Sequence, residues 1–365
     1  MTHPTITPRI IPQDAKARLR ILFIAKHAKW EGGLHPDDGN HALYHVETRE
    51  ILKALGLDLL LADRYEALFD RPEADFVFPL LNRGGFLNSE MLGPLLCTRA
   101  GIPFLGASPI LRGLADDKHL AKLCAAERDI PTAPWAVYRR GAPVDPSRCP
   151  EGQPTPRGPR LVIKPNASSA SWAVQDAFDW AGVEAAIADI HAQGHDAIVE
   201  PFLDGSDVEV PVITVDGEPV VMPMMLFEQA DPTHLRTYYE KRDLVDRAHK
   251  YQLVPFDDPE WMPIIADYTR RIAEDYRPFD YGRFEFRLDR ERGELRFLEV
   301  NLQANLWSEK VFGRSAVLAG LTQAQLIETI LYEGLRRNGL LGSDAGGRRA
   351  TDGASAAAQA SEARS

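Results

Sequence analysis

Residues 282–310, GRFEFRLDRERGELRFLEVNLQANLWSEK, read as two strands joined by a polar turn, and they decide the fold. Side chains alternate along a strand, so Arg283 and Glu285 share one face while the large apolar residues between them take the other. On the returning strand Glu299 and Asn301 share a face in the same way. Burying both apolar sets on one side predicts a register that brings the two acids together on the opposite side.

Two carboxylates that face each other across a strand ladder repel, so a cation is expected between them. Carboxylate and amide oxygens are ligands that Mg²⁺ takes in proteins, which makes Glu285, Glu299 and Asn301 candidate metal ligands. Leu298 and Val300 are expected on the buried face of the returning strand. The alternative is a solvent-facing sheet with scattered charge, but the abrupt polar end of the strand favours a metal site.

Composition limits the class of protein. The chain has 365 residues with 42 Lys plus Arg and 53 Asp plus Glu, a net charge of −11. An acidic chain has no overall attraction to nucleic acid or to an anionic membrane, so neither partner is expected and any phosphate site has to be local. Three widely spaced cysteines and the lack of a visible secretory signal or membrane-spanning run predict a cytoplasmic protein.

Upstream of the hairpin, strand and helix patterns alternate, which predicts a mostly parallel, doubly wound N-terminal domain over residues 19–110. A loose arm, residues 1–18, precedes it. The expected strands are 18–26, 58–63, 75–81 and 102–106, and the expected helices are 39–56 and 88–101.

The rest of the chain mixes strands, turns and helices, which predicts an antiparallel-rich α+β region. The segment 139–159 is crowded with Pro and Gly and is expected to be a loop, and the tail 341–365 is expected to be disordered. Strands are expected at 160–166 and within 196–226, and helices at 108–129, 180–194, 260–276 and 322–339.

The hairpin motifs RFEFR and FLEVN resemble the C-terminal signature of ATP-grasp ligases, specifically the D-alanine–D-alanine ligases. Further stretches match in the same order, at 77–135, 161–174, 198–210 and 238–244, so the resemblance runs from about residue 19 to 335. It implies the α/β ATP-grasp fold, with a central lobe at 111–205, a C-terminal lobe with the metal site at 206–340, and ATP held between them. It also implies a homodimer.

The resemblance implies roles for individual residues on the nucleotide side. Lys118 and Lys164 resemble the two ATP-phosphate lysines, and Lys241 resembles the lysine of a mobile loop that closes over the phosphates. Glu285, Glu299 and Asn301 match the Mg²⁺ ligands, where Mn²⁺ could also bind, and Arg283 matches the arginine that stabilises the acyl phosphate. Glu200, Phe202 and Leu203 occupy the strand that reads adenine, and Asp207 stands where a glutamate holds the ribose.

The substrate side departs from the family pattern. Lys310 stands where a serine binds the second substrate's carboxylate, and Asn305 replaces the glycine whose N–H supports the oxyanion. The glycine-rich turn becomes SSASW (168–172), which leaves Ser171 as a candidate substrate residue. The N-terminal substrate loop becomes the longer 26–41, and the stretch 82–88 also differs. That longer loop supplies the further substrate candidates Glu31, Asp37, Asp38 and His41.

These motifs favour an ATP-dependent ligase that joins a small-molecule carboxylate to an amine, in a specialised biosynthetic pathway and on amino-acid or dipeptide substrates. Phosphoryl transfer needs cations around the moving group, and two lysines, an arginine and Mg²⁺ supply them. Two alternatives stay open, an intramolecular ligase that closes a ring and a nucleotide sensor that only binds ATP. The presence of the arginine, both acids and the asparagine favours the enzyme.

Overall fold

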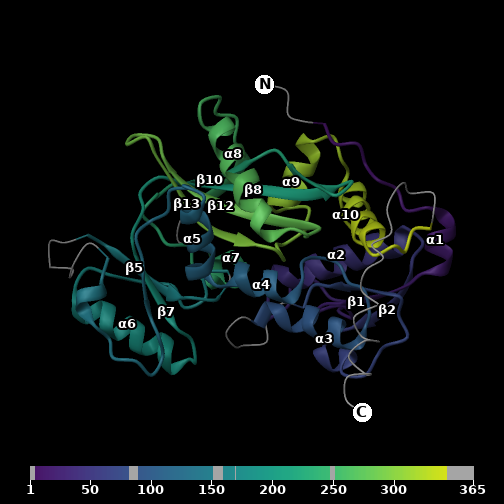
Figure 1. The fold of residues 1–365 in the computed structure, drawn as a ribbon, viewed down its shortest axis with the longest axis horizontal. Coiled ribbons are helices and arrows are strands. Elements are labelled where there is room, and N and C mark those ends of the chain that lie inside the picture. The colour runs from purple at the N-terminus through teal and green to yellow at the C-terminus, as the bar shows by residue number, and fades with distance from the viewer. Residues whose placement is uncertain (1–4, 82–88, 151–158, 169, 247–250, 343–365) are drawn as a thin grey trace, which may run out of the picture.

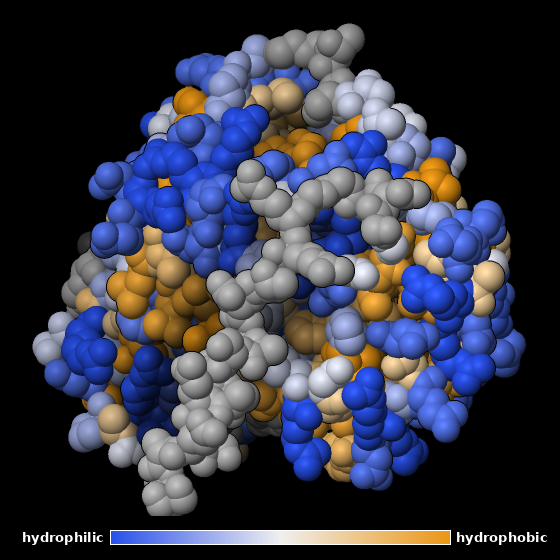
Figure 2. Space-filling model, turned by 45° about the vertical axis from the view of Figure 1, so that its right-hand side comes forward, coloured by the Kyte–Doolittle hydropathy of each residue, from blue (hydrophilic) through white to orange (hydrophobic). Residues whose placement is uncertain are grey.

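The computed structural model describes residues 5–81, 89–150, 159–168, 170–246 and 251–342. Within this part of the chain the strands form three sheets (Figure 1). One sheet lies in each of the three expected units, which are the N-terminal domain (19–110), the central lobe (111–205) and the C-terminal lobe (206–340). None of the helices there combines the length and apolar character that crossing a membrane requires. The face shown in Figure 2 is mainly hydrophilic, with apolar residues in scattered patches.

The first sheet is parallel, in the order β2-β1-β3, as the alternating pattern predicts. Ile21 and Phe23 of its central strand pack in a cluster with helices α2 and α10, whereas Leu22 and Ile24 pack in another with α3. Helices therefore cover both faces, which is the doubly wound arrangement. The elements are β1 (Arg20–Ile24), α2 (Asn40–Ala54), β2 (Asp58–Ala62), η1 (Tyr65–Leu68), β3 (Phe76–Pro79), η2 (Ser89–Met91) and α3 (Leu92–Ala100). The short strand expected at 102–106 is only an isolated bridge from Val77 to Phe104.

The prediction of a loose N-terminal arm is wrong for the described residues 5–18. Helix α1 (Gln13–Arg18) forms there, and Ile11 and Ala15 are buried in the first core cluster. Lys16 pairs with Glu328 of α10 at 2.7 Å, and the same carboxylate accepts a hydrogen bond from the Ile11 N–H at 3.1 Å. The apolar residues Ile6, Ile11 and Ala15 are four or five positions apart and lie among prolines, so they show no helical or strand periodicity in the sequence. All three nevertheless pack in the first core cluster.

The second sheet is antiparallel, in the order β4-β7-β5-β6, and α6 covers it with Val183, Ile187 and Ile190. The single helix expected at 108–129 is two helices. Asp117 interrupts it, because its side chain accepts a hydrogen bond from the Leu120 N–H at 3.0 Å and begins a new helix. The elements are α4 (Pro109–Asp116), α5 (Lys118–Glu127), β4 (Ala136–Tyr138), η3 (Pro146–Arg148), β5 (Leu161–Pro165), β6 (Gln175–Ala177), α6 (Trp180–Ala192) and β7 (Ala197–Pro201).

The third sheet follows the antiparallel order β11-β10-β8-β12-β13, with β9 paired to β8. Helices α4, α5 and α8 pack against it through one core cluster, so α5 belongs structurally with this sheet although it precedes the second one in sequence. The elements are β8 (Ser206–Val215), β9 (Glu218–Val221), β10 (Met225–Gln229), α7 (Tyr238–Lys241), β11 (Tyr251–Pro255), α8 (Trp261–Ala273), η4 (Glu274–Tyr276), β12 (Tyr281–Asp289), β13 (Glu294–Asn301), α9 (Val311–Leu318) and α10 (Gln323–Arg337).

The C-terminal end of the described chain returns to the first sheet. Helix α10, expected from the pattern at 322–339, packs Leu326, Ile327 and Ile330 into the cluster that contains Phe23 and Phe76, and Figure 1 shows it beside α1 and α2. Leu341 of the expected disordered tail is also buried in that cluster, and residues 343–365 lie outside the described residues.

The hairpin has the predicted register, with Glu285 opposite Glu299 and Arg283 opposite Asn301. A bulge follows, because Phe286 pairs with Phe297. The extra residue, Leu298, therefore leaves the apolar face and lines the same cavity as Glu299, so its predicted burial beside Val300 is wrong.

Candidate active site

A cavity of about 220 Å³ lies between the second and third sheets. Strands β5 and β7 contribute one wall, strands β8, β12 and β13 the other, and α7 reaches in from the side. The structure brings all of the nucleotide-side candidates together around this space, with the substrate candidate Ser171. The nucleotide-side residues are Lys118, Lys164, Glu200, Phe202, Leu203, Asp207, Lys241, Arg283, Glu285, Glu299 and Asn301.

Lys118 reaches the cavity from the first residue of α5. The end of that helix is fixed to the second sheet, because the Lys118 N–H donates to the Asn166 carbonyl at 2.9 Å. Its ammonium group lies 2.7 Å from the Ser168 carbonyl and 3.3 Å from Glu299. This lysine therefore bridges the wall formed by the second sheet to the acid of the hairpin.

Lys164 points into the cavity from β5 and lies 3.3 Å from Glu200 on the neighbouring strand. Burial disfavours its charged form, but Glu200 and Glu299 outweigh burial and raise the pKa of Lys164. The buried Glu200 also lies 3.5 Å from Lys122, a fully buried lysine that sequence reasoning missed. Glu200 thus holds two cations, a side-chain role that the adenine-strand prediction does not include.

Phe202 and Leu203 follow the end of β7, and one backbone group of each has a partner. The Phe202 N–H donates to the Arg160 carbonyl at 2.8 Å, and Arg160 stacks on the Phe202 ring at 4.2 Å. The Leu203 carbonyl accepts from Arg287 at 3.1 Å. Base reading by this segment stays a prediction.

Asp207 has partners other than the ribose that the resemblance implies. Arg287 donates to one of its oxygens at 2.8 Å and Arg236 to the other at 3.0 Å. Burial opposes ionisation of this carboxyl, but the two arginines prevail and lower its pKa to about 2. The carboxylate gathers two guanidinium groups at the wall of the cavity.

Three carboxylates stand in a row across the third sheet, one more than the sequence predicts. Glu209 of β8 pairs in register with Glu285, which pairs with Glu299. Arg283 lies 3.0 Å from both Glu209 and Glu285. Part of this could have been predicted, because strand alternation in the segment SDVEV (206–210) places Glu209 on the same face as Asp207. The sequence does not indicate, however, that β8 lies beside the hairpin.

The environments of the two hairpin acids differ. Burial, together with Glu209 and Glu299, raises the pKa of Glu285 even though Arg283 opposes the shift. Burial acts on Glu299 as well, but Lys118 and Lys164 outweigh it and lower the pKa of that carboxyl. A partly buried like-charge pair of this kind is stabilised by a cation.

The donor set fits a hard divalent cation. Glu285 and Glu299 present carboxylate oxygens to one cavity, and Asn301 adds an amide oxygen. That oxygen accepts a hydrogen bond from the Gln303 N–H at 2.9 Å, which fixes its direction.

Lys241 lies at the end of α7, a short helix that begins with Thr237 and Glu240 bonded reciprocally to each other's backbone. It lines the nucleotide-side cavity and the neighbouring cavity described below. Burial and the nearby Arg236 lower the pKa of Lys241 to about 8, although Glu285 opposes the shift.

The segment that carries Lys241 is fastened to the N-terminal domain. The Asn40 N–H donates to the Arg242 carbonyl at 3.1 Å, and the Asn40 side chain donates to Asp243 at 2.7 Å. Arg242 in turn donates to Asp38 at 2.9 Å. Loop 26–41 therefore positions the lysine segment.

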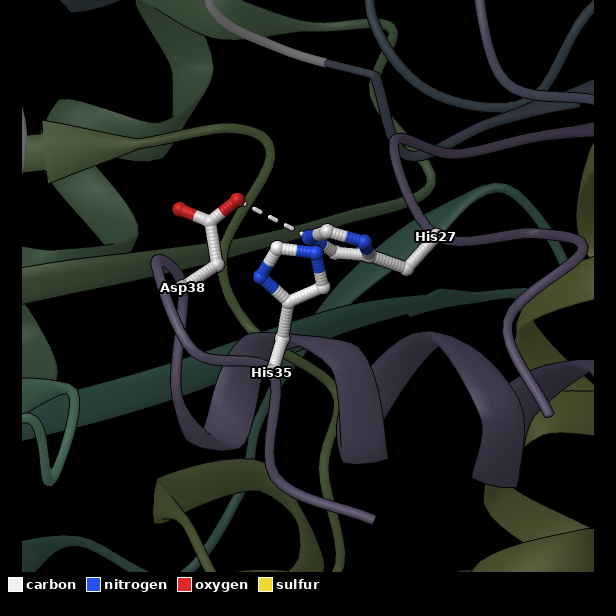
Figure 3. Close-up of side chains that lie close together, drawn as sticks. All are labelled: His27, His35 and Asp38. Carbon is white, nitrogen blue, oxygen red and sulfur yellow. Dashed lines mark hydrogen bonds and ion pairs between the residues drawn. The ribbon is translucent and has the colours of Figure 1, made fainter. Parts of the chain in front are cut away.

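Asp38 is the buried centre of this fastening, and Figure 3 shows it directed at His27, with His35 beside that ring. His27 and Asp38 lie 2.9 Å apart, and Lys26 pairs with the same oxygen. The hydrogen bond with His27 and the two cationic side chains lower the pKa of Asp38. The ligand atoms of the two histidines and Asp38 lie within 4.8 Å of one another, but Lys26 and Arg242 already balance the carboxylate and oppose a further cation.

A second cavity of about 130 Å³ adjoins the first and shares Ala170, Lys241, Arg283 and Asn301 with it. We call it the middle cavity. The predicted residues His41, Asn305 and Lys310 lie in its wall, with Tyr44 and Gln303, which sequence reasoning missed.

Two predicted residues of the middle cavity have defined local geometry. The Asn305 side chain accepts from the Trp307 N–H at 2.8 Å and so shapes the loop before α9. Burial, with Arg242, lowers the pKa of His41 to about 3, which keeps its imidazole neutral.

Glu31 lines neither cavity, and its contact with substrate stays a prediction. Its side chain is 84% exposed and lies 3.4 Å from Arg49. Arg49 also donates hydrogen bonds to the carbonyls of Ala28 and Trp30 at 3.0 Å each, which fixes the backbone of this part of the loop. Asp37 is exposed, and the divergent stretch 82–88 lies outside the described residues.

Residues 124–332 match the family model described as the D-ala D-ala ligase C-terminus. A curated relative, the uncharacterised protein y4sG of Sinorhizobium fredii, is 28% identical over 253 residues, 68% of this chain and 72% of the relative. The D-alanine–D-alanine ligase of Actinobacillus pleuropneumoniae is 25% identical over 285 residues, 77% of this chain and 89% of the relative.

Solved structures share the fold at lower identity. The D-alanine–D-alanine ligase of Bacillus anthracis, complexed with ATP, superposes with a TM-score of 0.66 at 16% identity and covers 87% of this chain and 98% of that one. The D-alanyl-alanine synthetase A of Vibrio cholerae gives a TM-score of 0.69 at 15% identity, with the same coverage.

Proposed function

The chain belongs to the D-alanine–D-alanine ligase family of ATP-grasp enzymes, and we propose that it forms a peptide or amide bond between substrates other than two D-alanine molecules. Membership confirms the predicted ATP-grasp fold and, at the level of the family, an ATP-dependent carboxylate–amine ligase. The choice of substrates and the roles of single residues are our proposal.

One observation carries the proposal. A single cavity joins the cationic side chains Lys118, Lys164, Lys241 and Arg283 to the paired acids of the hairpin. Cations around a carboxylate pair suit a nucleotide's phosphate tail, because they balance the charge of the phosphoryl group as it moves.

The reaction proceeds in two steps in this proposal. A carboxylate oxygen of the acid substrate takes the γ-phosphoryl group of ATP, and ADP leaves. The amine nitrogen of the second substrate then attacks the carbonyl carbon of the acyl phosphate and gives up one proton to water, and phosphate leaves with the electrons of the broken C–O bond. Lys118 and Lys164 hold the phosphates, Arg283 and Lys241 stabilise the acyl phosphate, and the Asn305 N–H supports the oxyanion.

Glu285, Glu299 and Asn301 would hold Mg²⁺ or Mn²⁺, which when bound neutralises phosphate charge. The rewritten substrate side supports different substrates. Lys310 stands in the middle cavity where the family has a serine, and a lysine attracts a substrate carboxylate more strongly than a hydroxyl does. We place the acid and the amine in this cavity, with His41 in its wall and Ser171 in the adjoining nucleotide-side cavity. A homodimer is a further expectation from the family.

The test measures ADP release from the full-length protein with MgATP, with and without pools of amino acids and dipeptides. We expect release that depends on particular members of a pool. A protein that binds ATP but releases no more ADP with any pool would be a sensor, and the ligase proposal would be wrong.

Glu299→Ala tests the metal assignment, with Glu294→Ala, an exposed acid of the same strand, as the matched control. We expect Mg²⁺-dependent ADP formation to fall at least a hundredfold in Glu299→Ala and to stay within twofold in Glu294→Ala, with both variants folded. Near-normal turnover of Glu299→Ala would show that this carboxylate does not hold the metal.

A further inference from the structure

A third cavity of about 460 Å³ lies beyond the middle cavity, and we call it the outer cavity. Its walls come from β10, β11, the loop before α9, and α9 itself. The residues that matter here are Phe227, Tyr251, Leu253, Trp307, Lys310 and Arg314.

The three cavities follow one another. Lys241 and Arg283 line both the nucleotide-side cavity and the middle cavity. Phe227 and Lys310 line both the middle cavity and the outer cavity. A substrate whose reacting end lies beside Arg283 can therefore extend past Lys310 into the outer cavity.

The volumes decide which part of a substrate goes where. The outer cavity, at about 460 Å³, is more than three times as large as the middle cavity, at about 130 Å³. The middle cavity suits the reacting ends of two substrates, and a larger substrate body needs the outer cavity.

Part of the outer cavity is aromatic and apolar. Phe227 of β10 and Tyr251 of β11 lie with ring centroids 5.6 Å apart, Arg236 stacks on both rings, and Leu253 follows Tyr251 on β11. Trp307 adds a further aromatic ring, with the Lys310 ammonium 5.9 Å from it. The rest of the lining is polar and charged, and it consists of Asp243, Gln252 and the ion pair of Glu309 with Arg314. The aromatic part favours a flat or apolar body, and the lysine favours a carboxylate close to it.

We propose that the outer cavity is the acceptor subsite, and that the amine substrate carries a bulky aromatic or apolar group. Its amine lies in the middle cavity, its carboxylate near Lys310, and its bulky group against Trp307. This inference rests on the ligase function proposed above. The same chemistry is offered by a free aromatic amino acid and by a short peptide with an aromatic residue.

The test compares acceptors of different size with the acid substrate that the pools identify. Glycine, alanine, phenylalanine and alanyl-phenylalanine are the acceptors, and the readout is kcat/KM for ADP release. We expect phenylalanine or alanyl-phenylalanine to exceed glycine at least tenfold, and the better of these two identifies the source of the aromatic group.

Leu253→Trp fills the outer cavity, and Val317→Trp, at an exposed position of α9 outside it, is the matched control. We expect Leu253→Trp to lose at least tenfold in kcat/KM for the bulky acceptor and less than twofold for glycine, while the control keeps both. If Leu253→Trp does not fold, Tyr251→Ala removes an aromatic wall, and a raised KM for the bulky acceptor alone is expected.

Two outcomes overturn the inference while leaving the ligase function intact. They are equal use of glycine and bulky acceptors by the natural protein, and an equal loss with both acceptors in the variants. Absence of turnover with every acid and amine pool would instead overturn the ligase proposal.

Discussion

Replacing Gly39 by alanine should release the segment that carries Lys241. Gly39 has φ +54° and ψ −127°, a conformation that residues with a side chain rarely adopt. A Cβ atom at this position would lie 1.8 Å from the Arg242 carbonyl oxygen, which is far inside van der Waals contact. The loop before α2 and the segment after α7 therefore cannot keep their present distance in Gly39→Ala.

The size of the effect follows from the contacts that would be lost. They include two hydrogen bonds from Asn40, each worth about 1 kcal/mol, and the buried Arg242–Asp38 pair, worth about 1.5–3 kcal/mol. Loss of about 3.5–5 kcal/mol lowers the ratio of molecules with Lys241 in place to molecules with it released by a factor of roughly 300 to 4,000, since each 1.4 kcal/mol is a factor of ten. We expect kcat/KM for ATP to fall by at least tenfold.

The assay is steady-state ADP release, with thermal unfolding measured in parallel. Gly33→Ala is the matched control, because Gly33 lies in the same loop and no heavy atom comes within 4 Å of an added Cβ. We expect this control to retain full activity. If Gly39→Ala also retained kcat/KM within twofold, the fastening of the Lys241 segment would have no bearing on turnover.

Three other changes test separate parts of the structure. Lys310→Ser should raise KM for the second substrate at least fivefold with KM for ATP unchanged, and an unaltered acceptor profile would remove Lys310 from the acceptor site. Arg337→Ala should lower the free energy of unfolding by about 3–5 kcal/mol in urea titrations, because it leaves the fully buried Asp280, now 2.9 Å from Arg337, without its cation. His41→Gln should make stability less sensitive to acid. In the unfolded chain this imidazole takes up a proton near pH 6.5, but in the folded chain only near pH 3. The free energy of unfolding therefore decreases as the pH is lowered from 6.5 to 3, and this residue accounts for about 1–2 kcal/mol of the decrease at pH 5. Parallel pH–stability curves for the variant and the natural protein would contradict this assignment.

The sequence alone predicted the hairpin because its pattern is local. Apolar residues with period two on both strands permit one register, and that register sets Glu285 opposite Glu299. The bulge at Leu298 was missed, since one extra residue in a strand leaves no mark on composition. Its consequence is an apolar side chain inside the nucleotide-side cavity.

The other differences between the sequence-based predictions and the structure come from contacts between segments far apart in the chain. Glu209 joins the acid row only because β8 lies beside β12, more than seventy positions away in the chain. The partners of Asp207 come from two further segments, through Arg236 and Arg287. The exposure of Glu31 depends on Arg49, whose guanidinium group holds the backbone of that loop.

The position of α10 constrains how the molecule is made. The first sheet lies early in the chain, yet one of its faces is completed by residues 326–335 of α10, beside α2. Synthesis proceeds from the N-terminus, so the opening strands emerge with part of an apolar side uncovered until some three hundred further residues have been made. Shortening the chain before Leu326 would therefore expose part of the core of its first domain, far in sequence from the cut.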